Sequence, residues 1–201
     1  MRRRWPLLAG ALIVALGALT AVGILLSGDG REQASAGAAA IGGPFRLTDQ
    51  NGARVTPEDF SGRYMLIYFG YTYCPDVCPL TLANMTQAVD LLPEEAAEKV
   101  VPIFITVDPE RDTVEQLAEY APLFGPELVA LTGTDAEVKA ATRAYRVYFN
   151  KVENGEGDAY LMDHSGFIYL MGPDGKYRTH FSHSTTPEEM AEAIREAVEG
   201  G

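Results

Sequence analysis

The sequence has few of the residues that bear most directly on function. It holds only two cysteines and three histidines, and its 16 lysines and arginines face 28 aspartates and glutamates, for a formal net charge of −12. Nucleic-acid binding depends on basic side chains that neutralise phosphates, so this excess of acid argues against a nucleic-acid partner. No internal repeat is evident. The chemistry of the chain therefore rests on a short list of candidate residues.

Charge is absent from a long stretch near the N-terminus. Residues 5–27 contain no charged side chain, and three arginines precede them. At about 1.5 Å per residue a helix of this length spans the roughly 30 Å hydrocarbon core of a bilayer. The sequence predicts a cytoplasmic start and transmembrane anchor over residues 1–27, oriented by the arginines, in the inner (cytoplasmic) membrane.

The residues after this stretch predict a tether and one exported domain. Residues 28–43 are rich in Gly and Ala, which is typical of a flexible tether. Residues 44–201 are of single-domain size and would face the periplasm or an equivalent extracytoplasmic space. The alternative is a cleaved signal peptide with Ala34-Ser35-Ala36 as its cleavage site. Both interpretations place the domain in an exported compartment.

Apolar patterning over the domain predicts an alternation of strands and helices. Strands are expected at Phe45–Asp49, Met65–Phe69, Val100–Val107, Leu128–Thr132, Phe167–Met171 and Lys176–Phe181, and helices from Pro79, Val114, Asp135 and Pro187. Such alternation indicates an α/β domain with a partly parallel sheet. A βαβ unit followed by a ββα end is the plan of a thioredoxin-like domain, in which the strand and helix at Leu128–Tyr145 are an insertion.

The two cysteines, Cys74 and Cys78, lie between the second predicted strand and the helix expected from Pro79. A structural disulfide is disfavoured, because a bridge across four residues closes a very small loop and removes little entropy from the unfolded chain. Pro favours the first helical position, so Cys78 is expected at or near the helix N-cap, where lowered thiol pKa values are expected. Thiolates there serve either disulfide exchange or a soft metal such as copper(I).

A third metal ligand must come from elsewhere in the chain. In the thioredoxin plan the loop before the hairpin strand faces the cysteine pair, and here that loop, residues 162–166, carries His164 in place of the usual proline. Two cysteines and one histidine suit copper(I) and tolerate copper(II), although a zinc site is also compatible with them. His180 and His183 are candidates for a secondary metal site, or they lie at a solvated strand end.

Several motifs resemble those of the Sco/SenC family, named for synthesis of cytochrome c oxidase. They are Cys-Pro-Asp-Val-Cys-Pro at 74–79, Val-Asp-Pro-Glu-Arg-Asp-Thr at 107–113, Leu-Thr-Gly-Thr at 131–134, Arg-Ala-Tyr-Arg-Val-Tyr at 143–148, Asp-His-Ser at 163–165 and Tyr-Leu-Met-Gly-Pro-Asp-Gly at 169–175. They follow the family's order over nearly the whole domain, and the single N-terminal anchor fits as well.

The resemblance implies a thioredoxin-like fold and a copper site made by Cys74, Cys78 and His164. It also implies delivery of copper to the CuA centre in subunit II of cytochrome c oxidase. Asp108 and Asp112 match the family's acidic motif, which is linked to the metal and redox behaviour of the site; alternatively, Asp108 simply ends a strand and Asp112 caps a helix. Copper binding needs reduced cysteines, so an exported thiol reductase is expected as a partner, and another copper chaperone is a further candidate.

Two rival functions use the same residues. A thiol-disulfide oxidoreductase would reduce the cysteines of the CuA site through Cys74 and Cys78, and a copper or redox sensor would signal to membrane partners. A peroxidase is disfavoured, because Thr72 stands one residue too close to Cys74 for the Thr-x-x-Cys pattern of peroxidatic sites. The expected chemistry of the metal carrier is ligand exchange and not bond-making catalysis.

Overall fold

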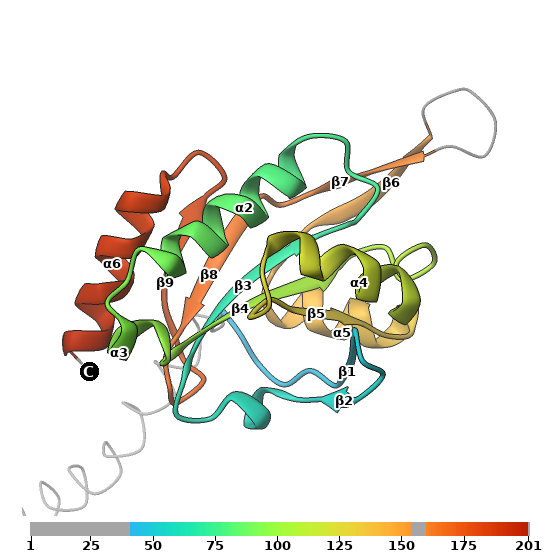
Figure 1. Cartoon of the computed structure of the whole chain (residues 1–201). Helices are drawn as coiled ribbons and strands as arrows, with labels where there is room; N and C mark the ends of the chain where they lie inside the picture. Colours follow the sequence, from blue (N-terminus) through green and yellow to red (C-terminus); the bar gives the residue numbers. More distant parts are fainter. Residues whose placement is uncertain (1–40, 154–159, 201) are drawn as a thin grey trace, which may run out of the picture. The chain divides into compact units, whose positions relative to one another are not determined.

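The computed structural model describes residues 41–153 and 160–200. The predicted anchor, and the predicted tether as far as residue 40, lie outside these ranges. Within the described ranges, no helix has both the length and the apolar character needed to cross a bilayer. The described part forms the α/β domain shown in Figure 1.

A seven-stranded mixed sheet with the order β2-β1-β5-β4-β3-β8-β9 forms the centre of the domain. Its strands are β1 (Leu47–Asp49), β2 (Arg54–Val55), β3 (Tyr64–Gly70), β4 (Val100–Thr106), β5 (Val129–Thr132), β8 (Phe167–Met171) and β9 (Tyr177–Ser182). β3, β4 and β5 are parallel, whereas β8 runs antiparallel to β3 and β9 antiparallel to β8. This confirms the partly parallel sheet and the inserted strand-helix segment.

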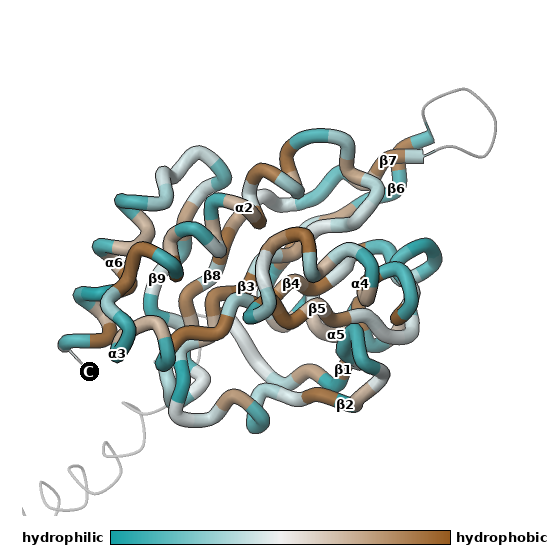
Figure 2. Tube along the Cα trace, viewed as in Figure 1, coloured by the Kyte–Doolittle hydropathy of each residue, from teal (hydrophilic) through white to brown (hydrophobic). Residues whose placement is uncertain are grey.

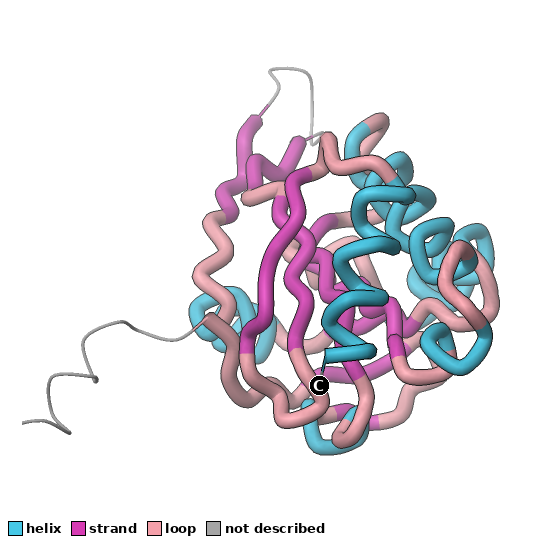
Figure 3. The backbone as a smooth tube through the Cα atoms, turned by 90° about the vertical axis from the view of Figure 1, so that its left-hand side faces the viewer, coloured by secondary structure: helices cyan, strands magenta, loops and turns pink. Residues whose placement is uncertain are grey.

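Helices cover both faces of the sheet. They are η3 (Pro57–Phe60), α2 (Val77–Asp90), α3 (Glu94–Ala97), α4 (Val114–Tyr120), η4 (Ala121–Phe124), α5 (Asp135–Ala144) and α6 (Pro187–Gly200). Figures 1 and 3 place α2, α4 and α6 on one face and α5 on the other. The predicted capping box of Thr134 and Glu137 begins α5, because Thr134 Oγ1 accepts from the Glu137 N–H and Glu137 accepts from the Thr134 N–H.

The core follows from two uninterrupted apolar strands. Every residue of β3 and β4 is buried, as expected for central parallel strands covered on both faces. Figure 2 shows these hydrophobic strands at the centre of the domain. The carboxyl ends of both strands meet at one edge of the sheet, and β3 leads directly to the segment that carries the cysteines.

A hairpin outside the main sheet is the principal departure from the predicted order of elements. β6 (Phe149–Glu153) pairs antiparallel with β7 (Tyr160–His164), and neither strand is among those that the sequence predicted. Most of β6 is exposed, and burial alternates along β7, so neither strand has a continuous apolar run. The hairpin extends past the N-terminal end of α2 in Figure 1.

Candidate metal centre

The cysteines lie at the junction of β3 and α2. The helix begins at Val77 with Asp76 as its N-cap, so it starts two residues earlier than the sequence predicted. Cys78 is therefore the second residue of the helix, is fully buried, and is not the N-cap. Cys74 precedes the helix and is partly exposed, and both cysteines are free thiols.

His164 reaches the cysteine pair from late in the chain. It is the last residue of β7, and its Nε2 atom lies 3.4 Å from Cys78 Sγ. Its Nδ1 atom lies 3.1 Å from the Ser165 carbonyl oxygen, and its ring stands edge-on to the rings of Tyr68 and Tyr71. These contacts orient the imidazole with Nε2 toward the sulfur. The predicted approach of His164 to the cysteines is present, although it comes from a strand end and not from a loop.

The two thiols have opposite electrostatic character. A hydrogen bond from the Cys78 thiol, and then backbone N–H groups at the start of α2, lower the pKa of Cys74 to about 5 despite partial burial. The Cys78 N–H lies 3.4 Å from Cys74 Sγ. The pKa of Cys78 is raised, because its thiol donates to Cys74 and because it is buried. The prediction of lowered pKa values thus holds for Cys74 and is wrong for Cys78, which retains its proton as the buried donor.

The spacing of these groups is close to that of a metal site but does not form a complete one. Bonds of about 2.0–2.3 Å, as zinc makes to nitrogen and sulfur, place two ligands of one tetrahedral metal roughly 3.5 Å apart. Cys78 Sγ and His164 Nε2 already have nearly this separation. Within the described part of the chain, however, no group of three or more His, Cys, Asp and Glu side chains is arranged to hold a metal ion. A metal held by Cys74, Cys78 and His164 together would therefore require these side chains to rearrange.

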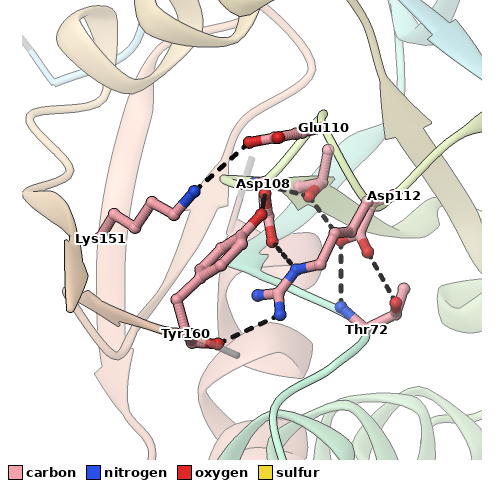
Figure 4. A network of polar contacts seen from close by, with 8 residues as sticks. Thr72, Asp108, Glu110, Asp112, Lys151 and Tyr160 are labelled. Atoms are coloured by element: carbon pink, nitrogen blue, oxygen red, sulfur yellow. Dashed lines mark hydrogen bonds and ion pairs between the residues drawn. The ribbon is translucent and has the colours of Figure 1, made fainter. Parts of the chain in front are cut away.

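Asp112, in the acidic motif, forms hydrogen bonds with the segment that leads to Cys74. The buried Asp112 carboxylate accepts from the Thr72 N–H at 3.0 Å, from Thr72 Oγ1 at 2.6 Å and from Thr106 Oγ1 at 2.6 Å (Figure 4). Burial raises the pKa of Asp112, although these donors oppose the effect. Asp112 does not cap α4, because Thr113 does so through its side chain. Thr72 stands two residues before Cys74, so Asp112 anchors the segment that carries the first cysteine.

Asp108 contacts the hairpin, through residues that the sequence analysis did not single out. Its carboxylate accepts from Tyr160 Oη at 2.9 Å and from Arg111 Nε at 2.5 Å (Figure 4). Arg111 Nη1 also donates to the Tyr160 carbonyl oxygen at 3.1 Å. The only signal of these partners in the sequence is the position of Arg111 inside the Val-Asp-Pro-Glu-Arg-Asp-Thr motif.

The structure does not bring His180 or His183 into a second metal site. His180 Nδ1 lies 2.5 Å from the Tyr177 hydroxyl, and its ring meets that of Phe167 edge-on. Within residues 41–153 and 160–200, neither histidine belongs to a group of three or more potential metal ligands. His180, on β9, and His183, just after that strand, are both exposed, which agrees with a solvated strand end.

Known proteins resemble this chain over nearly the whole predicted domain. The family model SCO1/SenC matches residues 33–199. This chain belongs to the SCO1/SenC family. It is 45% identical over 163 residues to protein sco1 of Schizosaccharomyces pombe, which covers 80% of this chain and 62% of that protein. The chain spans 49–62% of the length of the first three curated relatives that it matches.

Solved structures of relatives share the thioredoxin-like fold. The copper-bound structure of Bradyrhizobium japonicum ScoI is 46% identical, has a TM-score of 0.72, and covers 79% of this chain and 99% of its own. Another match, at 27% identity and a TM-score of 0.63, covers 79% of this chain and 94% of its own. It is described as revealing a disulfide switch in BsSco, a member of the Sco family of cytochrome c oxidase assembly proteins. Copper and redox chemistry thus both occur among the relatives of this chain.

Proposed function

We propose that this protein carries copper for the assembly of cytochrome c oxidase and delivers it to the CuA site of subunit II. The observation that supports this most directly is the 3.4 Å approach of His164 Nε2 to Cys78 Sγ, across 86 residues of sequence. The copper-bound state of a 46% identical relative supports the identity of the metal. Cys74, Cys78 and His164 are the proposed ligands, since two thiolates and an imidazole suit copper(I) and tolerate copper(II).

Metal loading would use the asymmetry of the two thiols. Cys74, with its pKa near 5, is already a thiolate at neutral pH and provides the first ligand. Cys78 would lose its proton as the metal replaces the Cys78–Cys74 hydrogen bond. A rearrangement of the two cysteine side chains and His164 would then complete the ligand set. Three ligands leave room for a fourth, so an acceptor with its own thiolates takes the metal by ligand exchange, without prior release into solution.

The surroundings of the site fit this role. We assign Asp112 the task of holding the Cys74 segment in place through Thr72, and Asp108 the task of holding the hairpin through Tyr160. An exported thiol reductase would keep the cysteines reduced, and a second copper chaperone would supply the metal. The predicted anchor over residues 1–27 would keep the domain at the outer surface of the inner membrane.

The test compares copper retention by His164→Ala with that by His180→Ala, in full chains purified anaerobically. His180 is an exposed histidine of the same domain whose ring contacts Tyr177 and Phe167, so it controls for the loss of an imidazole as such. We expect His180→Ala to keep about one copper per chain and His164→Ala to lose most of it and to fail in oxidase assembly. Equal retention by both variants, with oxidase assembly intact, would refute the carrier function.

A second candidate is a thiol-disulfide oxidoreductase that reduces the CuA cysteines. It is favoured by the pairing of a partly exposed Cys74 of low pKa with a buried, protonated Cys78, because a nucleophilic thiolate and a second thiol are what disulfide exchange requires. The disulfide switch described for BsSco agrees with it. His164→Ala again distinguishes the functions, since the oxidoreductase would keep its exchange activity and its assembly phenotype without the imidazole.

A further inference from the structure

We infer that Arg111 is a positioning residue that holds the strand bearing His164 against the body of the domain and so sets the approach of the imidazole to the cysteines. The inference rests on the proposed role of His164 as a ligand. Arg111 lies between Asp108 and Asp112, and the sequence predicted a role only for these two aspartates.

Arg111 joins three separate segments. Its Nε donates to Asp108 Oδ2 at 2.5 Å, and its Nη1 donates to the Tyr160 carbonyl oxygen at the start of β7 at 3.1 Å. The guanidinium carbon lies 3.6 Å from the ring centre of Tyr160, 4.7 Å from that of Tyr73 and 5.7 Å from that of Tyr71. Tyr71 and Tyr73 belong to the segment that ends at Cys74. One side chain therefore contacts both the cysteine segment and the hairpin.

Strand β7 links Tyr160, which contacts Arg111, to His164 at its other end. Side chains alternate along a strand, so Tyr160, Met162 and His164 share one face. These three are buried or partly buried, whereas Leu161 and Asp163 between them are exposed. Tyr160 is fixed at one end of this face through its hydroxyl to Asp108 and its ring to Arg111. His164 stands four residues further along the same face, at the cysteines.

The hairpin has few other attachments near this point. β6 and β7 pair only with each other and form no ladder with the seven-stranded sheet in the described residues. Lys151 on β6 lies 3.7 Å from the Tyr160 ring centre and 3.6 Å from Glu110, but its side chain is half exposed. The contacts of Tyr160 with Asp108 and Arg111 are therefore a buried polar attachment at the start of the strand.

Arginine and lysine would differ at this position. Arg111 Nη2 is buried and has no hydrogen-bond partner among the described residues, and the guanidinium carbon lies over the Tyr160 ring. A lysine would keep the positive charge but would lose the fork that reaches Asp108 and the Tyr160 carbonyl together, and the flat face that meets the rings. Arg111→Lys thus tests whether the shape of the guanidinium matters in addition to its positive charge.

The test begins with the metal-free, reduced full chain in detergent. The chain has only three histidines, so nitrogen–proton correlation spectra of the imidazole rings resolve His164 from His180 and His183. We expect Arg111→Met, Arg111→Lys and Tyr160→Phe to shift or broaden the His164 signals and leave the other two unchanged. Arg195→Lys is the control, because Arg195 is an ion-paired arginine on the exposed face of α6, where its partners are Glu192 and Glu199.

The second readout is copper(I) affinity by competition with a chelator. Loss of a residue that orients a ligand typically weakens metal binding about 10-fold or more, and we expect this for Arg111→Met and not for Arg195→Lys. If the His164 signals and the affinity of the Arg111 and Tyr160 variants match those of Arg195→Lys, the inference is wrong. Tyr160→Phe removes a single hydroxyl, so it keeps the test valid if an Arg111 variant does not fold.

The outcomes separate this inference from the proposed function. If His164→Ala binds copper as tightly as the native chain while the Arg111 variants still move the His164 signals, the ligand role fails and the positioning role stands. If His164→Ala loses copper and the Arg111 variants leave the His164 signals in place, only the positioning role fails.

Discussion

The Asp112 carboxylate and Thr72 are joined by two hydrogen bonds, one from the Thr72 N–H at 3.0 Å and one from its hydroxyl at 2.6 Å. This double contact ties the segment before Cys74 to the turn that precedes α4. Asp112 is fully buried and Thr72 is partly buried. The relationship makes the acidic motif a structural support of the cysteine site, which can be tested by removing its carboxylate.

Asp112→Ala should destabilise the domain strongly. It leaves the Thr72 N–H and the hydroxyls of Thr72 and Thr106 without their acceptor, and hydrogen bonds to a charged group contribute about 1.5–3 kcal/mol each. We expect the free energy of unfolding in urea to fall by about 3 kcal/mol. Asp112→Asn should lose less, since its amide oxygen still accepts.

Asp135→Ala is the control for Asp112→Ala. Asp135 is an exposed aspartate in the first turn of α5, paired with Lys139. Removing such a surface charge should cost less than about 1 kcal/mol. If Asp112→Ala and Asp135→Ala unfold at the same urea concentration, the buried hydrogen bonds of Asp112 do not support the fold as described.

Gly70→Ala should disturb the proposed metal site, because Gly70 lies next to the sulfur of Cys78. A Cβ atom at Gly70, the last residue of β3, would lie 2.9 Å from Tyr68 Cε1, 3.1 Å from Cys78 Sγ and 3.1 Å from Phe104 Cε2. Overpacking of a core in this way typically costs about 1–3 kcal/mol. We expect a lower urea midpoint and weaker copper binding, because the sulfur of Cys78 must move. Gly200→Ala, with no atom within 4 Å of the added carbon, should leave both unchanged.

Cys74 should react as a thiolate over most of the accessible pH range. Its folded-state pKa of about 5 lies below that of an ordinary thiol, so its thiolate fraction rises as pH increases through 5 and is complete near neutrality. The rate of alkylation by iodoacetamide should have its midpoint near pH 5, with mass spectrometry locating the label at Cys74. The lowered pKa also means that this thiolate stabilises the fold at alkaline pH and loses that effect as pH falls toward 5.

Two variants of Cys78 check the cause of the low pKa of Cys74. Cys78→Ser keeps a side-chain donor and should keep a low midpoint for Cys74 alkylation. Cys78→Ala removes the donor and should move the midpoint to higher pH, because the hydrogen bond from Cys78 is the largest cause of the shift. A midpoint near pH 8.5 in the unmodified protein would contradict the assigned asymmetry.

The parts of the fold that the sequence predicts well are those with a strong local signal. The continuous apolar runs of β3 and β4 identify buried central strands, and the Thr134–Glu137 capping box marks the start of α5. His164 was found because the thioredoxin plan places its segment opposite the cysteines. That inference depends on the order of elements and not on any local property of the histidine.

The missed features depend on contacts between distant residues. β6 and β7 stabilise each other outside the main sheet, so neither has the apolar pattern of a strand in a core. Arg111 has no local feature to distinguish it from a surface arginine, since its partners Tyr160 and Tyr73 lie on other segments. The raised pKa of Cys78 arises from its hydrogen bond to the sulfur of Cys74 and from burial. Neither cause can be predicted from the position of Cys78 near the start of a helix.

Tyr68 should tune the reduction potential of the cysteine pair. Its hydroxyl lies 3.5 Å from Cys78 Sγ and is a buried donor to that sulfur. A net contribution of about 1 kcal/mol from this hydrogen bond corresponds to about 20 mV for a two-electron couple. Tyr68→Phe removes a contact that favours the reduced thiols, so its potential should become more negative by about this amount.

The measurement equilibrates the metal-free protein with thiol-disulfide buffers of known potential and traps the free thiols with a maleimide. Tyr145→Phe is the matched control, because Tyr145 is equally buried but packs against Phe69 and Tyr169, away from the cysteines. Its potential should equal that of the native chain. An unchanged or more positive potential in Tyr68→Phe would show that the hydroxyl does not stabilise the reduced sulfur, and the control of redox state would then rest with Cys74 and the start of α2 alone.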